Sequence, residues 1–107
     1  YRPLMKTAER QSSIDFQKIN IVTDGLKVLS NPDRLKILCV LIECELNVQA
    51  IEKNTQILQP TLSQQLTVLR NAHMVSCRRE GKNIYYKIID DKVLIIMQTL
   101  YTLYCAV

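Results

Sequence analysis

The sequence predicts a small, mainly α-helical domain with about five helices and one two-stranded β-hairpin before the last helix. Only two glycines and three prolines occur among 107 residues, and 48% of the residues are hydrophobic, which indicates a compact chain dominated by helix. Apolar residues recur at helical spacing in several segments, while two β-rich runs flank Glu80–Asn83. We predict a single domain over residues 1–107, with residues 1–13 as a loosely ordered N-terminal arm.

The first two predicted helices each carry one apolar stripe. The first covers Ile14–Leu29, and the second begins after Asn31, where Asn31 can cap, Pro32 fits the first helical position and Asp33 suits the positive helix end. The second helix is expected to run to about Glu43. The stripe of the first helix comprises Ile19, Val22, Leu26 and Leu29, and that of the second Leu35, Leu38, Leu41 and Ile42, with Cys39 at its margin.

The next two predicted helices, Val48 to about Asn54 and Pro60–Ala72, resemble a DNA-reading unit in their residue types. On the longer helix Leu62, Leu66 and Leu69 form one stripe. The opposite side carries Pro60, Ser63, Gln64 and Thr67. Gln can pair with adenine in the major groove, and Ser and Thr can contact base edges or phosphates. This helix alone leaves a DNA-reading face and an ordinary polar face equally open.

A β-hairpin over Val75–Ile89 and a final helix over Asp91–Ala106 complete the predicted fold. Arg78, Arg79 and Lys82 at the hairpin tip can lie along DNA phosphates. The final helix is apolar around most of its surface, so we expect a second subunit to cover it.

Composition and charge indicate the partners, the location and the cysteine chemistry to expect for such a domain. The formal charge of +4 and a pI near 9.0 are compatible with nucleic acid without proving it. No apolar run is long enough to span a bilayer and no signal peptide is visible, so we expect a cytoplasmic protein without a membrane partner. The four cysteines form no CxxC pair and are expected to be reduced, which disfavours a disulfide framework or a zinc ribbon.

Three segments, in order, resemble the ArsR-type winged-helix repressors. Ser30–Leu38 looks like their opening L-S-(H/N)-P-x-R-L-x-I-L, Gln59–Leu69 resembles their recognition helix S-x-S-x-V-S-x-H-L-x-V-L, and Arg78–Tyr86 resembles their wing R-R-E-G-(R/K)-x-x-Y-Y. The resemblance implies a winged helix-turn-helix homodimer that pairs through its first and last helices and binds double-stranded operator DNA. The DNA-binding residues expected on this basis are Gln59, Thr61, Ser63, Gln64, Thr67, Arg78, Arg79 and Lys82.

Departures from the family pattern predict that no metal and no cofactor is bound. Arsenic, cadmium and lead sensors of the family carry E-L-C-V-C where this chain has Glu45–Gln49, and Asn and Gln are poor ligands for thiophilic metals. Zinc and nickel members use His and Asp on the last helix, but the one histidine here is His73, after the recognition helix. We expect His73 to be a capping or left-handed residue.

Cys39 and Cys105 are the predicted redox switch. From residue types alone, small buried hydrophobes are the more common fate of free cysteines. The contexts I-L-C-V-L and L-Y-x-L-Y-C nevertheless resemble the persulfide-responsive branch of the family, which implies that reactive sulfur is the inducer and that oxidation releases the operator. Cys44, between Glu43 and Glu45, and Cys77 are predicted to be structural or incidental.

Three alternatives to a persulfide-sensing repressor stay open at this point. One is a general redox-responsive regulator or anti-repressor of the same fold, and another is a dimeric scaffold that has lost DNA binding. A thiol enzyme is disfavoured, because no base, Arg or helix N-terminus is recognisably placed beside Cys39 or Cys105. We therefore predict that the protein is not an enzyme.

Overall fold

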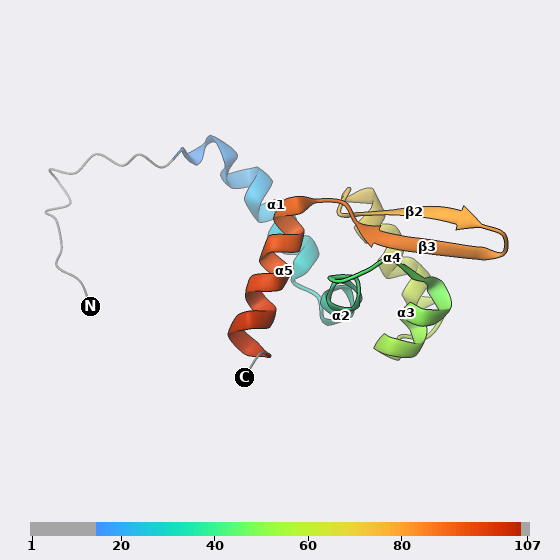
Figure 1. Ribbon diagram of the computed structural model, residues 1–107. Helices are drawn as coiled ribbons and strands as arrows, with labels where there is room; N and C mark the ends of the chain where they lie inside the picture. Colours follow the sequence, from blue (N-terminus) through green and yellow to red (C-terminus); the bar gives the residue numbers. More distant parts are fainter. Residues whose placement is uncertain (1–14, 106–107) are drawn as a thin grey trace, which may run out of the picture.

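The computed structural model describes residues 15–105, which contain five α-helices and one antiparallel sheet (Figure 1). The elements in chain order are a 3₁₀ turn (Phe16–Lys18), α1 (Ile19–Leu29), α2 (Pro32–Val40), β1 (Leu46–Asn47), α3 (Val48–Thr55), α4 (Thr61–Asn71), β2 (Val75–Glu80), β3 (Asn83–Ile88) and α5 (Asp91–Tyr104). The mainly helical fold with a hairpin before the last helix is confirmed. The predicted N-terminal arm, residues 1–13, lies outside the described residues.

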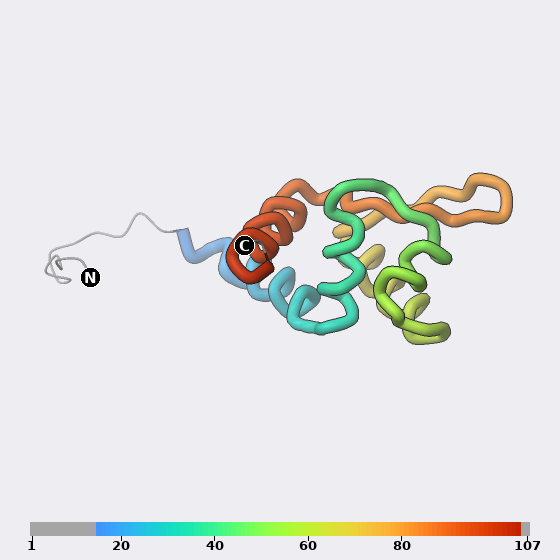
Figure 2. Tube along the Cα trace, turned by 60° about the horizontal axis from the view of Figure 1, so that its bottom comes forward, coloured from blue at the N-terminus to red at the C-terminus, as the bar shows by residue number. Residues whose placement is uncertain are grey.

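The elements separate into two ends of an elongated molecule. Helices α1 and α5 lie at one end, and the β2–β3 hairpin projects at the other (Figures 1 and 2). Helices α2, α3 and α4 lie between them, with α2 in contact with α1, α3, α4 and α5. This central position makes α2 the element through which the two ends are joined.

Helix α2 begins as predicted but ends earlier. The Asn31 side-chain oxygen accepts a hydrogen bond from the Arg34 backbone N–H at 3.0 Å, with Pro32 in the first turn. The predicted end near Glu43 is wrong, because the helix stops at Val40 and the Leu41 N–H already bonds to the carbonyls of Ile37 and Leu38 in a tighter turn. The chain has to turn here so that Leu46 can reach the sheet.

The sheet has three strands in the order β1–β3–β2, so the prediction of a two-stranded hairpin is incomplete. Strand β1 pairs antiparallel with β3 through Leu46 opposite Tyr86 and Asn47 opposite Tyr85. A strand of two residues is too short to show an alternating sequence pattern. Asn47 also caps α3, because its side-chain oxygen accepts a hydrogen bond from the Ala50 N–H at 2.8 Å. The β2–β3 turn is made by Gly81 at φ +64°, a conformation that favours glycine.

Other helix boundaries follow local capping. α3 and α4 begin and end within one residue of the predicted bounds. The first helix begins at Ile19 rather than Ile14, because Asp15 caps a 3₁₀ turn by accepting from the Gln17 N–H at 2.9 Å, and Ile14 lies outside the described residues. The last helix ends at Tyr104, and Ala106 is also outside them.

The core lies between α2, α3, α4, β2 and the start of α5. Leu62, Leu66 and Leu69 of α4 are at most 2% exposed, which confirms the predicted apolar stripe. They pack in one cluster with Leu29, Ile37, Leu38, Leu41, Ile51, Ile57, Met74, Val75, Val93 and Met97. His73 has φ +59° and donates its backbone N–H to the Arg70 carbonyl at 2.9 Å just after α4, so its predicted left-handed conformation is confirmed.

Much of the apolar surface of α1 and α5 stays uncovered in a single copy of the chain. On α1, Leu29 is buried, whereas Ile19, Val22 and Leu26 are 45–53% exposed. Helix α5 buries Val93 and Met97 but exposes Ile95, Tyr101, Leu103 and Tyr104. Within residues 15–105, no helix combines the length and the apolar character needed to cross a membrane.

Candidate functional site

The outward face of α4 carries the predicted base-reading side chains. Thr61, Ser63, Gln64 and Thr67 are all exposed, on the side opposite the buried leucines. Gln59, just before the helix, accepts from the Ser63 backbone N–H at 3.1 Å and from the Ser63 hydroxyl at 2.7 Å. Gln59 therefore caps the first turn of α4, which has no other side-chain cap.

The hydroxyl groups of Ser63 and Thr67, two predicted contact residues on α4, already form local hydrogen bonds. The Thr67 hydroxyl donates to the Ser63 carbonyl at 2.8 Å, and the Ser63 hydroxyl donates to Gln59. Among the described residues, by contrast, the Gln64 side chain has no hydrogen-bond partner, so its amide oxygen and nitrogen are both available to a base edge. Gln64 is the side chain on this face with the most unused hydrogen-bonding capacity.

The turn between α3 and α4 is fixed by a threonine that the sequence analysis missed. Thr55 is buried; its hydroxyl donates to the Ile51 carbonyl at 2.7 Å and accepts from the Ile57 backbone N–H at 3.2 Å. Gln56 follows in a left-handed conformation with φ +64°. Because Thr55 is polar and lies at the helix end, composition gave no sign that it orients the start of α4.

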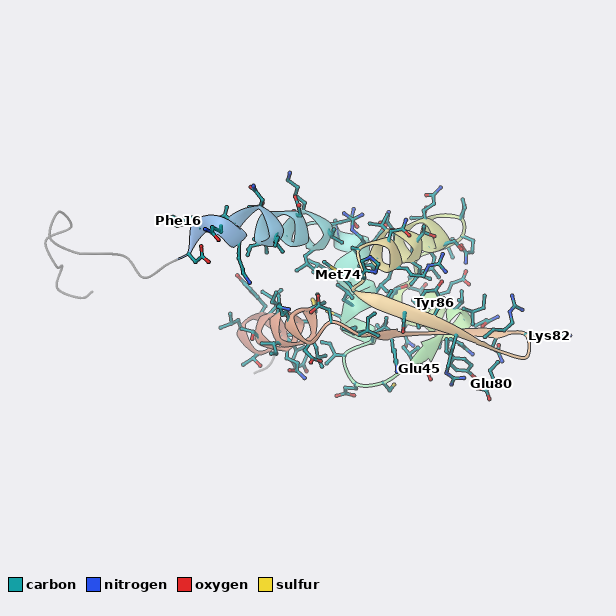
Figure 3. The ribbon with its side chains drawn as sticks, turned by 90° about the horizontal axis from the view of Figure 1, so that it is seen from above. Phe16, Glu45, Met74, Glu80, Lys82 and Tyr86 are labelled. Atoms are coloured by element: carbon teal, nitrogen blue, oxygen red, sulfur yellow. The ribbon has the colours of Figure 1, made fainter. Side chains whose placement is uncertain are left out.

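The three hairpin cations that were predicted to contact DNA lie in different places. Strand residues alternate between faces, and the register puts Arg79 on one face with Cys77 and Tyr86, and Arg78 on the other with Tyr85. Lys82 lies at the tip (Figure 3). In the described part of the chain, Arg79 and Lys82 form no ion pair.

Arg78 is held by acidic neighbours that sequence reasoning missed. Its guanidinium bonds to Glu45 at 2.8 and 3.0 Å and to Glu80 at 2.6 Å, and it lies 4.7 Å from the centroid of the Tyr85 ring. The hydrogen bonds to Glu45 and Glu80 raise the pKa of Arg78, and the bond from Arg78 lowers the pKa of the Glu45 carboxyl. A phosphate contact by Arg78 must therefore share the guanidinium with these carboxylates, whereas Arg79 and Lys82 carry no such competition.

A second missed contact joins α4 to the hairpin. The Arg70 guanidinium in the last turn of α4 donates to the Cys77 sulfur at 3.4 Å, and this bond raises the pKa of Arg70. Cys77 lies opposite Tyr86 in the sheet, and burial raises the pKa of Tyr86. Cys77 thus contacts a side chain of α4, and its role as structural or incidental stays a prediction.

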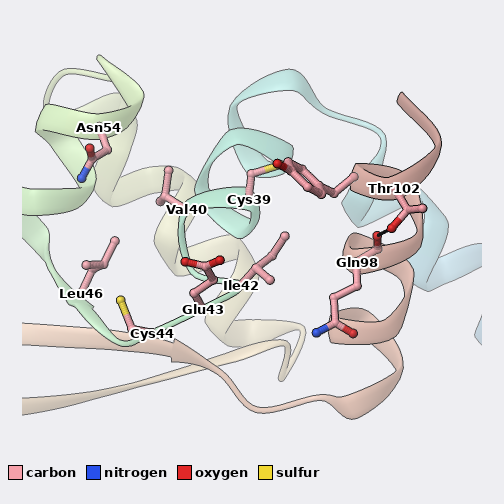
Figure 4. Close-up of a pocket in the computed structure, with 10 residues that line it drawn as sticks. Cys39, Val40, Ile42, Glu43, Cys44, Leu46, Asn54, Gln98 and Thr102 are labelled. Carbon is pink, nitrogen blue, oxygen red and sulfur yellow. Dashed lines mark hydrogen bonds between the residues drawn. The ribbon is translucent and has the colours of Figure 1, made fainter. Parts of the chain in front are cut away.

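Cys39 and Cys105 come from α2 and from the end of α5. Both residues are exposed, so the alternative of two buried hydrophobes is wrong. The Cys39 side chain points toward α5 (Figure 4), and its partial burial raises the pKa of the thiol. A negative charge on Cys105 raises the pKa of Cys39 further.

Cys39 also lines a pocket of about 800 Å³ between α2, the segment after it and α5. Glu43 and Cys44 line the same pocket, and Cys44 lies on the side away from α5 (Figure 4). Gln98, Tyr101 and Thr102 form the α5 wall. Small molecules in solvent can therefore reach Cys39 through this pocket.

No group of three or more His, Cys, Asp and Glu side chains that could hold a metal ion occurs among residues 15–105. His73 lies in the turn between α4 and β2.

Comparison with known proteins decides the family. The protein-family model described as "Bacterial regulatory protein, arsR family" matches residues 31–76. The biofilm growth-associated repressor of Agrobacterium fabrum is 46% identical over 81 residues, which cover 76% of this chain and 69% of that protein. The chain belongs to the ArsR family. The predicted resemblance is confirmed, and the protein is a transcriptional regulator of the winged helix-turn-helix type, not an enzyme.

Two further similar proteins are named as transcriptional regulators. The crystal structure of the transcriptional repressor BigR from Xylella fastidiosa superposes with a TM-score of 0.80 at 43% identity and covers 85% of this chain and 93% of that one. The transcriptional activator HlyU of Vibrio cholerae is 35% identical over 80 residues, 75% of this chain and 74% of that protein. Helices α3 and α4 are thus the helix-turn-helix, and β2–β3 is the wing.

The raised pKa of Cys39 generates a prediction about its reactivity. Because the thiolate is the nucleophile, we expect alkylation of Cys39 by iodoacetamide to rise with pH and to reach its midpoint above that of an unperturbed thiol. Cys105→Ser removes the neighbouring negative charge and should move this midpoint to lower pH. Mass spectrometry of the Cys39 peptide across a pH series measures both. Cys77→Ser is the control and should leave the profile unchanged; an unchanged midpoint in Cys105→Ser would show that the two thiols do not interact.

Proposed function

We propose that this ArsR-family protein is a homodimeric repressor that binds double-stranded operator DNA through α4 and the wing. We further propose that it releases the DNA when reactive sulfur links Cys39 to Cys105. The observation that carries the switch is the packing of α2 on α5, with the exposed Cys39 side chain pointing toward α5 (Figure 4). One thiol is on α2, in contact with the reading helix, and the other ends α5.

The polar face of α4 and the unpaired cations of the wing support operator binding. Gln64 is suited to a base edge, and Arg79 and Lys82 to phosphates. Exposed Thr61, Ser63 and Thr67 complete the proposed reading face, with Gln59 holding Ser63 in place. The similar proteins from Agrobacterium and Xylella are named as repressors, which favours repression as the direction of control.

The exposed apolar side chains of α1 and α5 support a homodimer. Both helices lie at the end of the molecule opposite the wing (Figure 1), so two copies joined there by a two-fold axis would place one reading helix on either side of that axis. Two reading helices must enter successive major grooves about 34 Å apart. A second copy is also the simplest cover for an apolar surface of this kind.

The proposed switch is a two-electron oxidation of the thiol pair by a persulfide, R–S–SH. In the proposed order of steps, the exposed Cys105 at the end of α5 is the first nucleophile. Its thiolate attacks the terminal sulfur, forming Cys105–S–SH and expelling RS⁻. The Cys39 thiolate then attacks the Cys105 sulfur, forms the disulfide and expels HS⁻. If both thiols first become persulfides, one attacks the other and yields a trisulfide and H₂S.

A general redox-responsive regulator or anti-repressor is the second candidate. It is favoured by the likeness to the Vibrio cholerae protein, which is named as an activator. The two candidates differ in the inducer and in the direction of control, not in the thiol pair. A thiol enzyme is disfavoured, because burial and a neighbouring charge make Cys39 a poor thiolate at neutral pH and because the relatives are regulators.

We expect a stable homodimer in the absence of DNA. Val22 on α1 is 53% exposed, and Val22→Asp should shift the protein toward monomer, because a desolvated charge opposes burial of this face. Sedimentation at micromolar concentration measures the change. Leu58→Asp, at an exposed apolar residue next to α4, is the matched control and should remain dimeric. A monomeric parent protein would contradict the proposed assembly.

We expect Gln64→Ala to weaken specific over non-specific DNA binding by ~1–3 kcal/mol, because a base-reading pair is lost. Arg79→Ala should weaken both alike and lower the salt dependence by about one counterion, because a phosphate contact is lost. Operator affinity measured over a salt series separates the two effects. Gln49→Ala, on the exposed side of α3, serves as the control. Parental specificity ratios in both variants would show that the reading helix and the wing are wrongly assigned.

We expect reduced protein to bind the operator, polysulfide-treated protein to release it, and reductant to restore binding. Cys39→Ser and Cys105→Ser should bind DNA with or without polysulfide, because neither can form the bridge. Cys44→Ser and Cys77→Ser are the matched controls and should respond like the parent. Operator affinity of the four variants, with mass spectrometry of the bridge, provides the measurement. Normal release by Cys39→Ser would remove the thiol switch while leaving operator binding intact.

A further inference from the structure

We propose that Arg34 and Gln65 form a clasp that sets the orientation of the reading helix α4 relative to α1. Arg34 is a positioning residue in this account, since it holds α4 in place for DNA and does not itself contact DNA. The inference deepens the proposed function and rests on operator binding through α4.

The clasp is a set of hydrogen bonds from one guanidinium to two other helices. From α2, Arg34 donates through Nε to the Val28 carbonyl at 2.6 Å and through Nη2 to the Lys27 carbonyl at 3.5 Å, both in the last turn of α1. Its Nη1 donates to Gln65 Oε1 on α4 at 2.8 Å. Arg34 therefore joins three helices at one half-buried point.

The geometry calls for arginine. The last carbonyls of a helix have no partner within that helix and carry partial negative charge, so a cation is favourable there. A guanidinium presents several donors in one rigid plane, so it can satisfy the end of α1 and still point a further N–H at Gln65. Lysine has a single ammonium on a flexible stem and cannot hold both partners in fixed directions.

Gln65 differs from its neighbour Gln64 in what it faces. Gln64 is exposed, whereas Gln65 is half-buried beside the leucine stripe of α4. The Gln65 side-chain oxygen accepts from Arg34, so this glutamine is turned toward α2 and not toward DNA. The two adjacent amides thus have separate roles, one as a base reader and one as an anchor of the helix.

The clasp lies on the path between the proposed dimer face and the reading helix. Helix α1 carries the exposed Ile19, Val22 and Leu26 at the end where a second copy is proposed to pack. Through Arg34, the end of that helix is tied to the middle of α4. A change in how α1 sits in the dimer would therefore turn α4 relative to the operator.

The test uses the reduced, full-length protein with Gln65→Leu, Arg34→Lys and the double variant. We expect each single variant to lose about tenfold in specific operator affinity, the effect of one charge-assisted hydrogen bond. Non-specific affinity and the salt dependence should stay parental, because no phosphate contact is removed. The double variant should be no weaker than the weaker single variant, because both changes break one interaction. Gln49→Leu is the matched control and should bind like the parent.

Three outcomes would overturn the clasp, and each is distinct. Operator affinity of Gln65→Leu within about twofold of the parent would show that the bond does not position α4. A loss of non-specific affinity in Arg34→Lys that matches its loss of specific affinity would show a direct DNA contact, and fully additive losses in the double variant would show two independent roles. If the parent itself forms no specific complex with DNA, the proposed function fails, and the role of the clasp fails with it.

Discussion

Burial of the leucine stripe on α4 is the constraint on which the rest of the structure depends. Leu62, Leu66 and Leu69 are almost completely buried against the core. A helix repeats every 3.6 residues, so burying these three positions decides which side chains face outward. Replacing one such leucine by alanine costs about 2–5 kcal/mol, which is a large share of the ~5–15 kcal/mol that stabilises a small domain. The DNA-facing surface therefore cannot be rotated without losing the core, and Gln64 remains exposed as long as the protein is folded.

Local features of this fold could be predicted from the sequence, whereas contacts between distant segments could not. Helix periodicity located α3 and α4 to within a residue, and residue chemistry identified the Asn31 cap and the left-handed His73. The two-residue strand β1 was missed because it exists only through its pairing with β3. For the same reason the early end of α2 was missed, since the chain turns there to reach the sheet. The bonds of Arg34 to Gln65 and of Arg78 to Glu45 join residues more than thirty positions apart, and no spacing rule marks such pairs.

The formal charge of +4 does not show which cations of the wing are free to bind phosphate. The carboxylates of Glu45 and Glu80 pair with Arg78, so among the wing cations predicted to contact DNA only Arg79 and Lys82 form no ion pair within the described residues. Arg70, which bonds to Cys77, joins the end of α4 to β2. Helix α4 and the wing are thus connected by a side-chain contact as well as by the short turn through His73, so the proposed base-reading and phosphate-binding groups would form one surface.

Helix α2 explains how a change at a thiol could reach the DNA without unfolding the domain. It carries Arg34 near its start and Cys39 near its end, about 7.5 Å apart along a helix axis. A helix of this length moves as a rigid unit, so a covalent bond from Cys39 to the end of α5 would displace Arg34 together with the whole helix. The core leucines could stay buried while the Arg34–Gln65 bond changed its geometry. Only a few kcal/mol of difference in DNA affinity between the two arrangements is needed to empty an operator, which is the scale of a few hydrogen bonds. The same helix would then supply both the stable base of the reading unit and the element that a redox event moves.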